Sequence, residues 1–180
     1  MITVCSLARL GETVERTRAR HLVTLISGGT EVARPASIHA NDHLFLTFND
    51  ITAPAEGLTP PGEDHVRELI GFVRRWNLSG PMVIHCFAGI SRSTAAAYIT
   101  ACALQADADE EALAQALRAA SPSATPNPRL VALADSLLGR NGRMSAAIKE
   151  IGRGADAYEG TPFTFAVGGT SAPPAASAPR

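Results

Sequence analysis

The segment Met82-Val-Ile-His-Cys-Phe-Ala-Gly-Ile-Ser-Arg-Ser93, together with the alanine-rich stretch that follows it to Leu104, is the most informative part of this 180-residue chain. Residues 82–85 form a short, mainly apolar run after Gly80-Pro81, which is typical of a buried parallel strand. Residues 93–104 are rich in alanine, the strongest helix former. The segment therefore predicts a buried strand, a tight loop and a helix, in that order.

The rest of the chain continues this alternation of strands and helices. Three further runs are aliphatic and β-branched and are expected to be strands: 2–6, 21–26 and 43–48. Five polar or amphipathic stretches are expected to hold helices: 11–20, 63–77, 107–120, 129–138 and 144–151. Asp107 with Glu110 is expected to cap the third of these, and Asn127-Pro128 the fourth. The order predicts an α/β fold with a central, mostly parallel sheet flanked by helices and a helical C-terminal half.

Length and composition indicate one domain. Apolar residues make up 46% of the chain, and a domain near this length buries roughly 70% of its unfolded surface. Beyond Gly154 the chain has few aliphatic anchors and ends Ala-Pro-Pro-Ala-Ala-Ser-Ala-Pro-Arg180. We therefore expect a folded domain at 1–154 and a flexible or disordered tail at 155–180.

Charge and cysteine content argue against several classes of protein: nucleic-acid and membrane binders, disulfide-bonded proteins and thiolate zinc proteins. Sixteen basic and 17 acidic side chains give a net charge of −1, which provides no field to attract nucleic acid or a membrane surface. The three cysteines, Cys5, Cys86 and Cys102, are odd in number and form no Cys-x-x-Cys pair, which argues against disulfides and a thiolate zinc site. No secretory signal begins the sequence, and its longest apolar helical run, 93–106, is shorter than the roughly 18 residues of a membrane span. We expect a cytoplasmic protein; the sequence indicates no oligomeric state.

The loop between the predicted strand and helix is suited to binding an anion. Backbone N–H groups of a tight loop that leads into a helix point inward, and the positive end of the helix dipole adds to their field. Gly89 allows the loop to turn sharply or to approach a ligand closely. The candidate phosphate-binding residues are Phe87, Ala88, Gly89, Ile90, Ser91 and Arg92.

Three side chains beside this loop are candidate catalytic groups. Cys86 lies at the floor of the loop, where the field favours the nucleophilic thiolate over the thiol. The guanidinium of Arg92 is a planar fork that binds two phosphoryl oxygens at once. The hydroxyl of Ser93 is placed to donate to the sulfur and so ease its departure from phosphorus.

The pattern Cys-x5-Arg, preceded by His85 and followed by Ser93, resembles the signature of the cysteine-dependent protein tyrosine phosphatases. The sequence Ala-Gly-Ile-Ser-Arg-Ser at 88–93 is more similar to the compact dual-specificity branch, and most similar to small bacterial phosphatase-like proteins. The resemblance implies hydrolysis of a phosphorylated substrate, either a phosphoprotein or a small phosphate ester, through a phosphocysteine intermediate on Cys86. It also implies that neither a metal nor an organic cofactor is required, since Arg92 and the loop amides supply the positive charge.

The resemblance further implies an aspartic acid on a separate loop that protonates the leaving oxygen. Asp50 is the first candidate, because it follows the predicted strand 43–48, begins a long loop and lies at the upstream distance found in compact members of the family. The sequence lacks the Trp-Pro-Asp of the large tyrosine-specific enzymes, so Asp42 and Asp64 remain alternatives.

Other interpretations stay open beside a tyrosine or dual-specificity phosphatase. The cradle could recognise a phosphorylated partner without turnover, as in a pseudophosphatase, or act on inositol phosphates or phosphoinositides. Sulfur transfer also uses a cysteine in a strand-to-helix loop. The single arginine of the loop favours phosphotyrosine-like esters over highly charged inositol phosphates. His85 is expected to have a structural role, and Cys5 and Cys102 to lie in the core.

Overall fold

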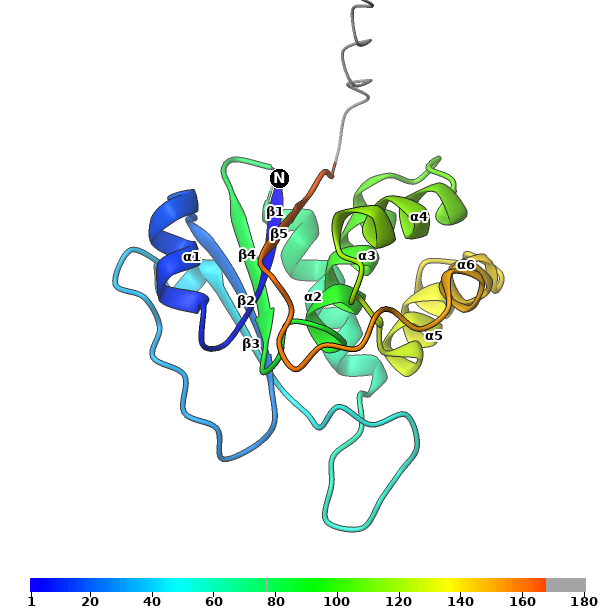
Figure 1. Ribbon diagram of the computed structural model, residues 1–180, viewed down its shortest axis with the longest axis horizontal. Helices are drawn as coiled ribbons and strands as arrows, with labels where there is room; N and C mark the ends of the chain where they lie inside the picture. Colours follow the sequence, from blue (N-terminus) through cyan, green and yellow to red (C-terminus); the bar gives the residue numbers. More distant parts are fainter. Residues whose placement is uncertain (77, 168–180) are drawn as a thin grey trace, which may run out of the picture.

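The four predicted strands and a fifth that was not predicted form one mixed sheet in the computed structural model, which describes residues 1–76 and 78–167 (Figure 1). The strands are β1 (Ile2–Ser6), β2 (His21–Ile26), β3 (His43–Thr47), β4 (Met82–Cys86) and β5 (Phe163–Phe165). The helices are α1 (Leu10–Thr17), α2 (Glu63–Trp76), α3 (Arg92–Leu104), α4 (Glu110–Ala120), α5 (Pro128–Leu137) and α6 (Arg143–Ile151), with a short 3-10 turn, η1, at Ala40–Asp42.

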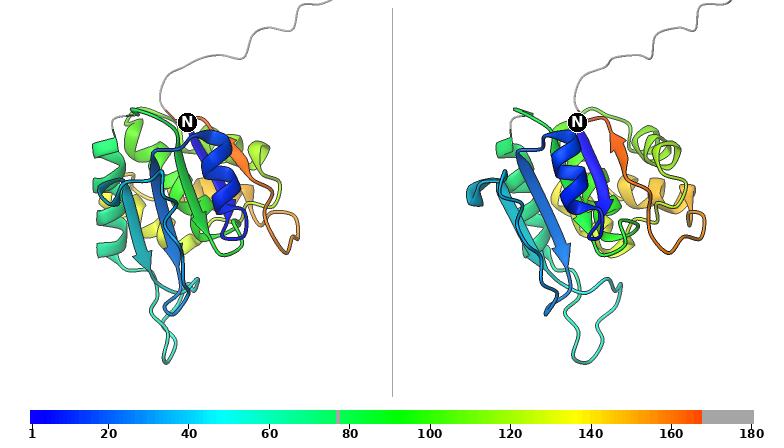
Figure 2. Two further views of the ribbon diagram at one scale, coloured as in Figure 1. Left: turned by 90° about the vertical axis from the view of Figure 1, so that its left-hand side faces the viewer. Right: turned by 60° about the vertical axis from the view of Figure 1, so that its left-hand side comes forward.

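The strand order within the described residues is β3-β2-β4-β1-β5. β4 is parallel to both β1 and β2, and β2 is parallel to β3, so the first four strands end at the same edge of the sheet. The register pairs Ser6 with Cys86, so β1 and β4 end side by side. The loops that follow β1, β2, β3 and β4 therefore meet at this edge, and the long loop after β3 projects from it (Figure 2).

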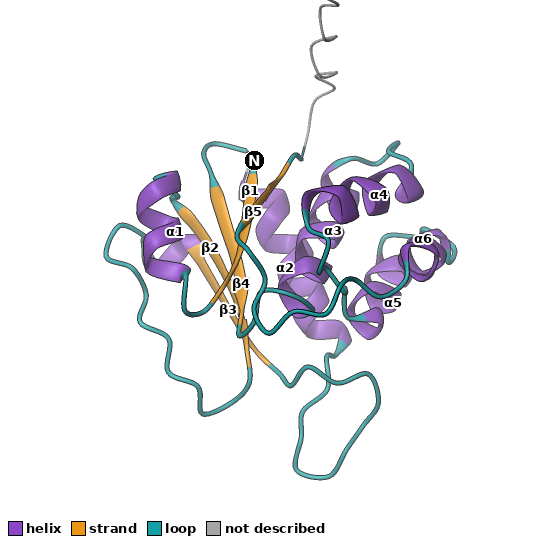
Figure 3. Ribbon diagram, in the orientation of Figure 1, coloured by secondary structure: helices purple, strands orange, loops and turns teal. Residues whose placement is uncertain are grey.

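Helices cover both faces of the sheet, with α1 on one face and the remaining helices on the other (Figure 3). The alternation along β4 explains this arrangement, because Met82 and Ile84 join the larger hydrophobic cluster while Val83 joins the smaller one beside Leu10 and Val14 of α1. The mostly parallel sheet, the flanking helices and the helical C-terminal half confirm the predicted α/β class.

Helix α3 lies at the centre of the helical layer and is buried from Arg92 to Cys102. Its alanines make it apolar on all sides, as a helix surrounded by other elements requires. Small side chains also let α2, α4 and α5 approach it closely, and all three contact it. The residue that begins this rigid central helix is Arg92.

One predicted helix cap is confirmed and the other is wrong. Asn127 caps α5, since its side-chain oxygen accepts from the N–H groups of Arg129 and Leu130. Helix α4 is capped by Asp109 rather than Asp107, and Glu110 is not a capping-box partner. The Glu110 carboxylate is buried and pairs with Arg140 at 2.8 Å. It therefore forms a tertiary ion pair instead of the capping-box hydrogen bond predicted for it.

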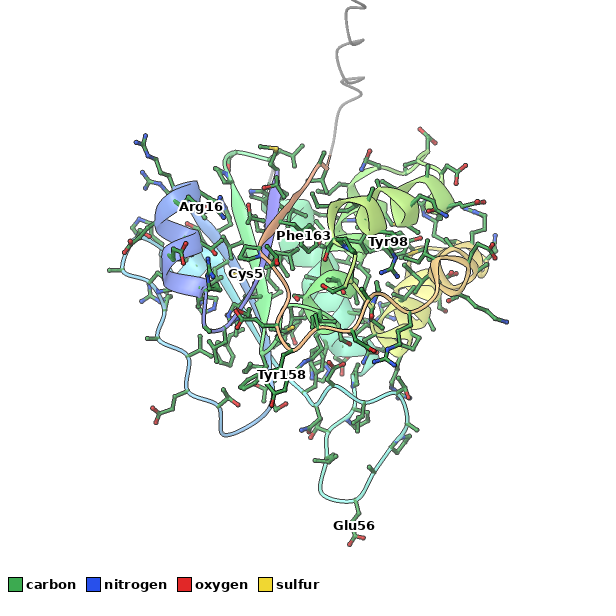
Figure 4. All side chains as sticks on the ribbon, in the orientation of Figure 1. Cys5, Arg16, Glu56, Tyr98, Tyr158 and Phe163 are labelled. Carbon is green, nitrogen blue, oxygen red and sulfur yellow. The ribbon has the colours of Figure 1, made fainter. Side chains whose placement is uncertain are left out.

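The folded region extends beyond the predicted boundary at residue 154. Residues 155–167, expected to be part of a flexible tail, run along the structure and include β5, which pairs antiparallel with β1. The buried rings of Phe163, labelled in Figure 4, and Phe165 join the main hydrophobic cluster. A three-residue strand is too short to be recognised from its pattern, which is why the prediction was wrong here. The rest of the predicted tail, 168–180, lies outside the described residues.

Candidate active site

The candidate site lies where β4 ends at Cys86 and α3 begins at Arg92. Four carbonyl groups of the intervening loop accept hydrogen bonds from amides outside it: Phe87 O from Leu7 N (3.1 Å), Ala88 O from Gly160 N (2.8 Å), Ile90 O from Thr125 N (2.9 Å) and Ser91 O from Asn127 N (3.4 Å). In a trans peptide the next N–H points away from the carbonyl, so the amides after these carbonyls point to the opposite side.

That opposite side is the side of the cysteine sulfur. The Gly89 N–H donates to Cys86 Sγ at 3.3 Å, which fixes the direction in which the inner amides point. The N–H groups of the loop and the positive end of α3 therefore converge above Cys86. The result is a concave site with the partial positive charge that an anion requires.

Gly89 is required by the close approach of the loop to β1. Its φ is +74°, and a Cβ placed there would lie 2.8 Å from Cys5 C and Ser6 N. Any other residue would be strained in this conformation and would collide with backbone atoms that cannot move aside. The end of β1 thus supports the loop from behind.

Cys86 and Ser93 lie in direct contact at the floor of the cradle. Cys86 is 2% exposed and Ser93 is fully buried, with 3.1 Å between Cys86 Sγ and Ser93 Oγ. A hydroxyl at this distance stabilises the thiolate by donating to it. The two side chains are therefore arranged as a nucleophile with a group that stabilises it as a leaving group.

Arg92 is buried, 5% exposed, and held from one side. Its Nη1 donates to Phe48 O at 2.8 Å and to Ser27 Oγ at 3.1 Å, which are at the ends of β3 and β2. Its Nε has no hydrogen-bond partner among the described residues, although it is buried. A buried guanidinium donor without a partner is costly and therefore points to an anionic ligand.

Asp50 is the aspartate that the fold brings to the loop. Its Oδ1 accepts from Ser91 Oγ at 2.8 Å and from Asn127 Nδ2 at 2.7 Å. Its Oδ2 forms an ion pair with Nε of Arg92 at 3.8 Å, a distance too long for a hydrogen bond. The carboxylate is therefore next to the place where a bound phosphoryl group would meet Arg92.

The two alternative aspartates lie elsewhere. Asp42 precedes β3, at the opposite edge of the sheet from the loop, and faces His21 Nε2 at 3.6 Å. Asp64 is exposed in the first turn of α2 and forms no hydrogen bond or ion pair with the residues that the structure describes. The geometry favours Asp50 over both.

Two residues of α5 hold the loop that carries Asp50, and the sequence did not indicate them as site residues. Asn127 contacts Asp50 directly. Arg129 Nε donates to Pro61 O at 2.7 Å and its Nη1 to Thr52 O at 3.4 Å, so it joins both ends of the long loop to α5. Only the Asn-Pro cap pattern was visible in the sequence, and it points to a helix start rather than to a partner for Asp50.

His85 has a structural position behind the loop. The ring is completely buried, with Nε2 at 2.8 Å from Thr24 Oγ1 and Nδ1 at 3.3 Å from Cys86 O. Burial lowers the pKa of His85 to about 4, so the ring is neutral near pH 7. A neutral ring that donates from Nδ1 to Cys86 O fixes the backbone of Cys86 from behind the loop.

The segment 154–162, which we call the strap, crosses the outside of the loop. Four hydrogen bonds fasten it: Gly154 N to Thr125 Oγ1 (3.1 Å), Ala155 N to Pro122 O (2.9 Å), Ser6 Oγ to Glu159 Oε1 (2.6 Å) and Gly160 N to Ala88 O (2.8 Å). Figure 4 shows the fully exposed Tyr158 on this segment, at the sheet edge where the loop lies. Apart from Gly154, the strap belongs to the stretch 155–180 that was predicted to be a flexible tail.

Among residues 1–76 and 78–167, no cluster of histidine, cysteine and acidic side chains is suited to hold a metal ion. Across the same residues, no helix combines the length and apolar character needed to cross a membrane. The three cysteines are buried and unpaired, and burial raises the pKa of both Cys5 and Cys102 to about 12. These two thiols stay protonated near pH 7, as expected of core cysteines.

Comparison with known proteins finds similarity to phosphatases in both sequence and fold. A family model described as protein-tyrosine phosphatase matches residues 45–123, a range that includes Asp50, Cys86 and Arg92. No curated protein is significantly similar to the chain in sequence.

Solved structures of phosphatases share the fold. The Cydia pomonella PTP-2 phosphatase superposes with a TM-score of 0.59 at 21% identity, covering 75% of this chain and 84% of that one. Human DUSP28 gives a TM-score of 0.58 at 17% identity, covering 78% and 89%. A mouse putative dual specificity phosphatase, crystallised with zinc tungstate, gives 0.56 at 16% identity, covering 79% and 84%. In its fold, and in the segment that carries Asp50, Cys86 and Arg92, the chain resembles the compact members of the cysteine-dependent protein tyrosine phosphatase superfamily.

Proposed function

We propose that this protein is a phosphomonoester hydrolase of the protein tyrosine or dual-specificity type, acting through a phosphocysteine intermediate. One observation carries the proposal. The sulfur of Cys86, the inward loop amides, the unpartnered Nε of Arg92 and the carboxylate of Asp50 all lie around one site. A nucleophile, an anion cradle and an acid in that arrangement are what transfer of a phosphoryl group to sulfur requires.

In the first step, the Cys86 thiolate attacks phosphorus and an S–P bond forms. The P–O bond to the leaving group breaks, and the carboxyl proton of Asp50 passes to that oxygen. Arg92 and the amides of residues 87–92 bind the phosphoryl oxygens, whose charge is redistributed as the transition state forms. Phe48 O and Ser27 Oγ hold the guanidinium of Arg92 in place through Nη1. Its other N–H groups therefore need little reorganisation to bind the phosphoryl oxygens in the transition state.

In the second step, water attacks the phosphocysteine and its proton passes to the Asp50 carboxylate. The S–P bond breaks and the Cys86 thiolate leaves, stabilised by the hydroxyl of Ser93 at 3.1 Å. Phosphate and the starting enzyme are the products. Because Arg92 and the loop amides supply the positive charge, we propose that the reaction requires no metal ion or organic cofactor.

The proposed substrate is a phosphotyrosine-like ester on a protein or small molecule. The loop provides a single arginine, whereas a densely charged inositol phosphate favours several basic groups. The balanced net charge supports a substrate other than a nucleic acid or a membrane surface. A reducing, cytoplasmic setting fits chemistry in which Cys86 must stay a free thiolate.

The test is hydrolysis of p-nitrophenyl phosphate and phosphotyrosine by the wild type, Cys86→Ser, Arg92→Lys and Asp50→Asn, with EDTA present. We expect turnover of both esters by the wild type and none by Cys86→Ser. Asp50→Asn should lose more on phosphotyrosine, because general acid catalysis is worth roughly 10²–10⁴-fold and an activated leaving group needs less of it.

Two outcomes would contradict the proposal. A wild-type protein that binds phosphate analogues through Arg92 but releases no phosphate would be a recognition module. Loss of activity in EDTA that zinc or magnesium restores would exclude the metal-free mechanism.

A further inference from the structure

The carboxylate of Asp50 has two oxygens in very different surroundings. Oδ1 accepts two hydrogen bonds, from Ser91 Oγ at 2.8 Å and Asn127 Nδ2 at 2.7 Å. Oδ2 accepts none from the residues that the structure describes and lies 3.8 Å from the buried Nε of Arg92. The side chain is 34% exposed, so it lies at the mouth of the cradle rather than beneath it.

This asymmetry determines where a proton can reside. A protonated carboxyl group has one oxygen that bears the proton and one that only accepts. The side-chain amide of Asn127 can only donate from Nδ2, and the Ser91 hydroxyl donates to the same oxygen. Since both donors occupy Oδ1, the transferable proton of Asp50 belongs on Oδ2 once a bound phosphoryl group has taken up the Nε–H of Arg92, which otherwise faces this oxygen.

Both donors are themselves held in place. The other atom of the Asn127 amide, Oδ1, accepts from the N–H groups of Arg129 and Leu130 at 3.0 and 3.1 Å as the cap of α5. Asn127 is 2% exposed, and its own N–H donates to Ser91 O at 3.4 Å. The cap therefore fixes which end of the amide faces Asp50, and Ser91 directly precedes Arg92 in the chain.

We propose that Ser91 and Asn127 are positioning residues that hold the Asp50 carboxyl by Oδ1 and keep its transferable proton on Oδ2, next to the leaving oxygen. This inference rests on the proposed function, in which Asp50 is the acid. In the first step the O–H bond at Oδ2 breaks as the P–O bond breaks, and the leaving oxygen takes the proton. In the second step Oδ2 takes the proton of the attacking water, while Oδ1 keeps both hydrogen bonds throughout.

Three variants separate this role from a structural one: Ser91→Ala, Asn127→Ser and the double variant. Serine is a good helix cap, so Asn127→Ser retains a cap for α5 while its shorter side chain cannot reach Asp50. Asp109→Ser is the matched control, because it makes a comparable cap replacement on α4, away from the site. Melting temperatures of all variants report whether the fold is intact.

The readout is kcat/KM for phosphotyrosine divided by kcat/KM for p-nitrophenyl phosphate, compared with Asp50→Asn, because kcat/KM reports the steps up to formation of the phosphocysteine and not its hydrolysis, which is the same for both esters. We expect each single variant to lose about tenfold on phosphotyrosine, the value of a hydrogen bond to a charged group, and little on the activated ester. The double variant should approach the ratio of Asp50→Asn, and Asp109→Ser should keep the wild-type ratio.

The inference is overturned if the double variant keeps the wild-type ratio, or if it loses the same factor on both esters as a misfolded loop would. Failure of the proposed function has a different signature. In that case the wild type itself hydrolyses neither ester, or Asp50→Asn has the wild-type ratio, and the positioning role is overturned together with the acid role.

Discussion

Single atoms set the chemistry around Cys86. Its sulfur accepts a hydrogen bond from the Gly89 N–H and lies 3.1 Å from the Ser93 hydroxyl. Two donors are therefore placed to stabilise a thiolate at this position. Attack on phosphorus uses the thiolate as a nucleophile, which donors make less reactive. Its departure uses the thiolate as a leaving group, which donors stabilise. In the proposed mechanism the Ser93 hydroxyl therefore contributes mainly to the second step.

Replacement of Ser93 by alanine should slow hydrolysis of the intermediate more than its formation. The expected result is a burst of one alcohol product per enzyme followed by a steady state about tenfold slower, because one hydrogen bond to a charged group is lost. Rapid-mixing kinetics with p-nitrophenyl phosphate measure this directly. Ser93→Thr, which keeps a hydroxyl, is the control, and an equal slowing of burst and steady state in Ser93→Ala would contradict the assignment.

At the scale of elements, the loop between β4 and α3 is supported by segments that are distant in sequence. The end of β1 lies behind Gly89, the residues before α5 bind Ile90 O and Ser91 O, and the strap binds Ala88 O. Each of these hydrogen bonds takes up a loop carbonyl and so leaves the amides pointing inward. The shape of the anion cradle is therefore a property of the surrounding elements as much as of the loop itself.

Gly160→Ala tests the contribution of the strap. A Cβ at this position would lie 2.7 Å from Gly89 O, so the strap or the loop must move. We expect kcat/KM to fall by at least about tenfold, since misplacement of catalytic groups by about 1 Å is that costly, while the protein stays folded.

The matched control is Gly11→Ala in α1, where an added Cβ meets no atom within 4 Å. This variant should keep full activity and gain up to about 1 kcal/mol in the free energy of unfolding, because alanine is the better helix former. Full activity of Gly160→Ala would show that the strap has no influence on the loop.

The parts of the fold and site that could be predicted are those encoded locally. Cys86, Gly89 and Arg92 lie within one strand-loop-helix unit, so their spacing alone predicts that they share a site. The contact of Asp50 with Asn127 and that of Ser6 with Glu159 join segments far apart in the chain. No periodicity reports such pairs, because they depend on how the elements pack together.

On the scale of the whole molecule, the stability of the sheet depends on pH through two histidines, the buried His85 and the half-buried His43. His43 on β3 and His85 on β4 both bond Thr24 of β2, each at 2.8 Å from its hydroxyl. Burial lowers the pKa of each ring to about 4. This network ties the three strands together behind Cys86, and a neutral His85 ring fits it, since Nε2 accepts from the Thr24 hydroxyl while Nδ1 donates to Cys86 O.

The free energy of unfolding should therefore fall as the pH falls from about 6.5 to about 4. In this range the unfolded chain binds protons at both histidines, at their ordinary pKa near 6.5, while the folded rings stay neutral. Stability is thus fully present above pH 6.5 and lost toward pH 4. Urea unfolding across this range measures the effect.

Two variants make this pH test specific. His43→Gln should reduce the dependence of stability on pH, because one of the two rings with a lowered pKa is gone. His39→Gln, at an exposed position outside the network, is the control and should retain the acid-side loss. Stability that is independent of pH between 6.5 and 4 in the wild type would contradict buried, neutral rings.

The most direct test of the whole account is to look for the covalent intermediate. Ser93→Ala, mixed with an aryl phosphate and quenched during turnover, should carry one phosphate on the peptide that contains Cys86, and mass spectrometry detects it. The same experiment with Cys86→Ser should give no adduct and no phosphate release. Steady hydrolysis by Cys86→Ser, or a phosphate attached to any other residue during turnover, would contradict the central claim that Cys86 is the nucleophile.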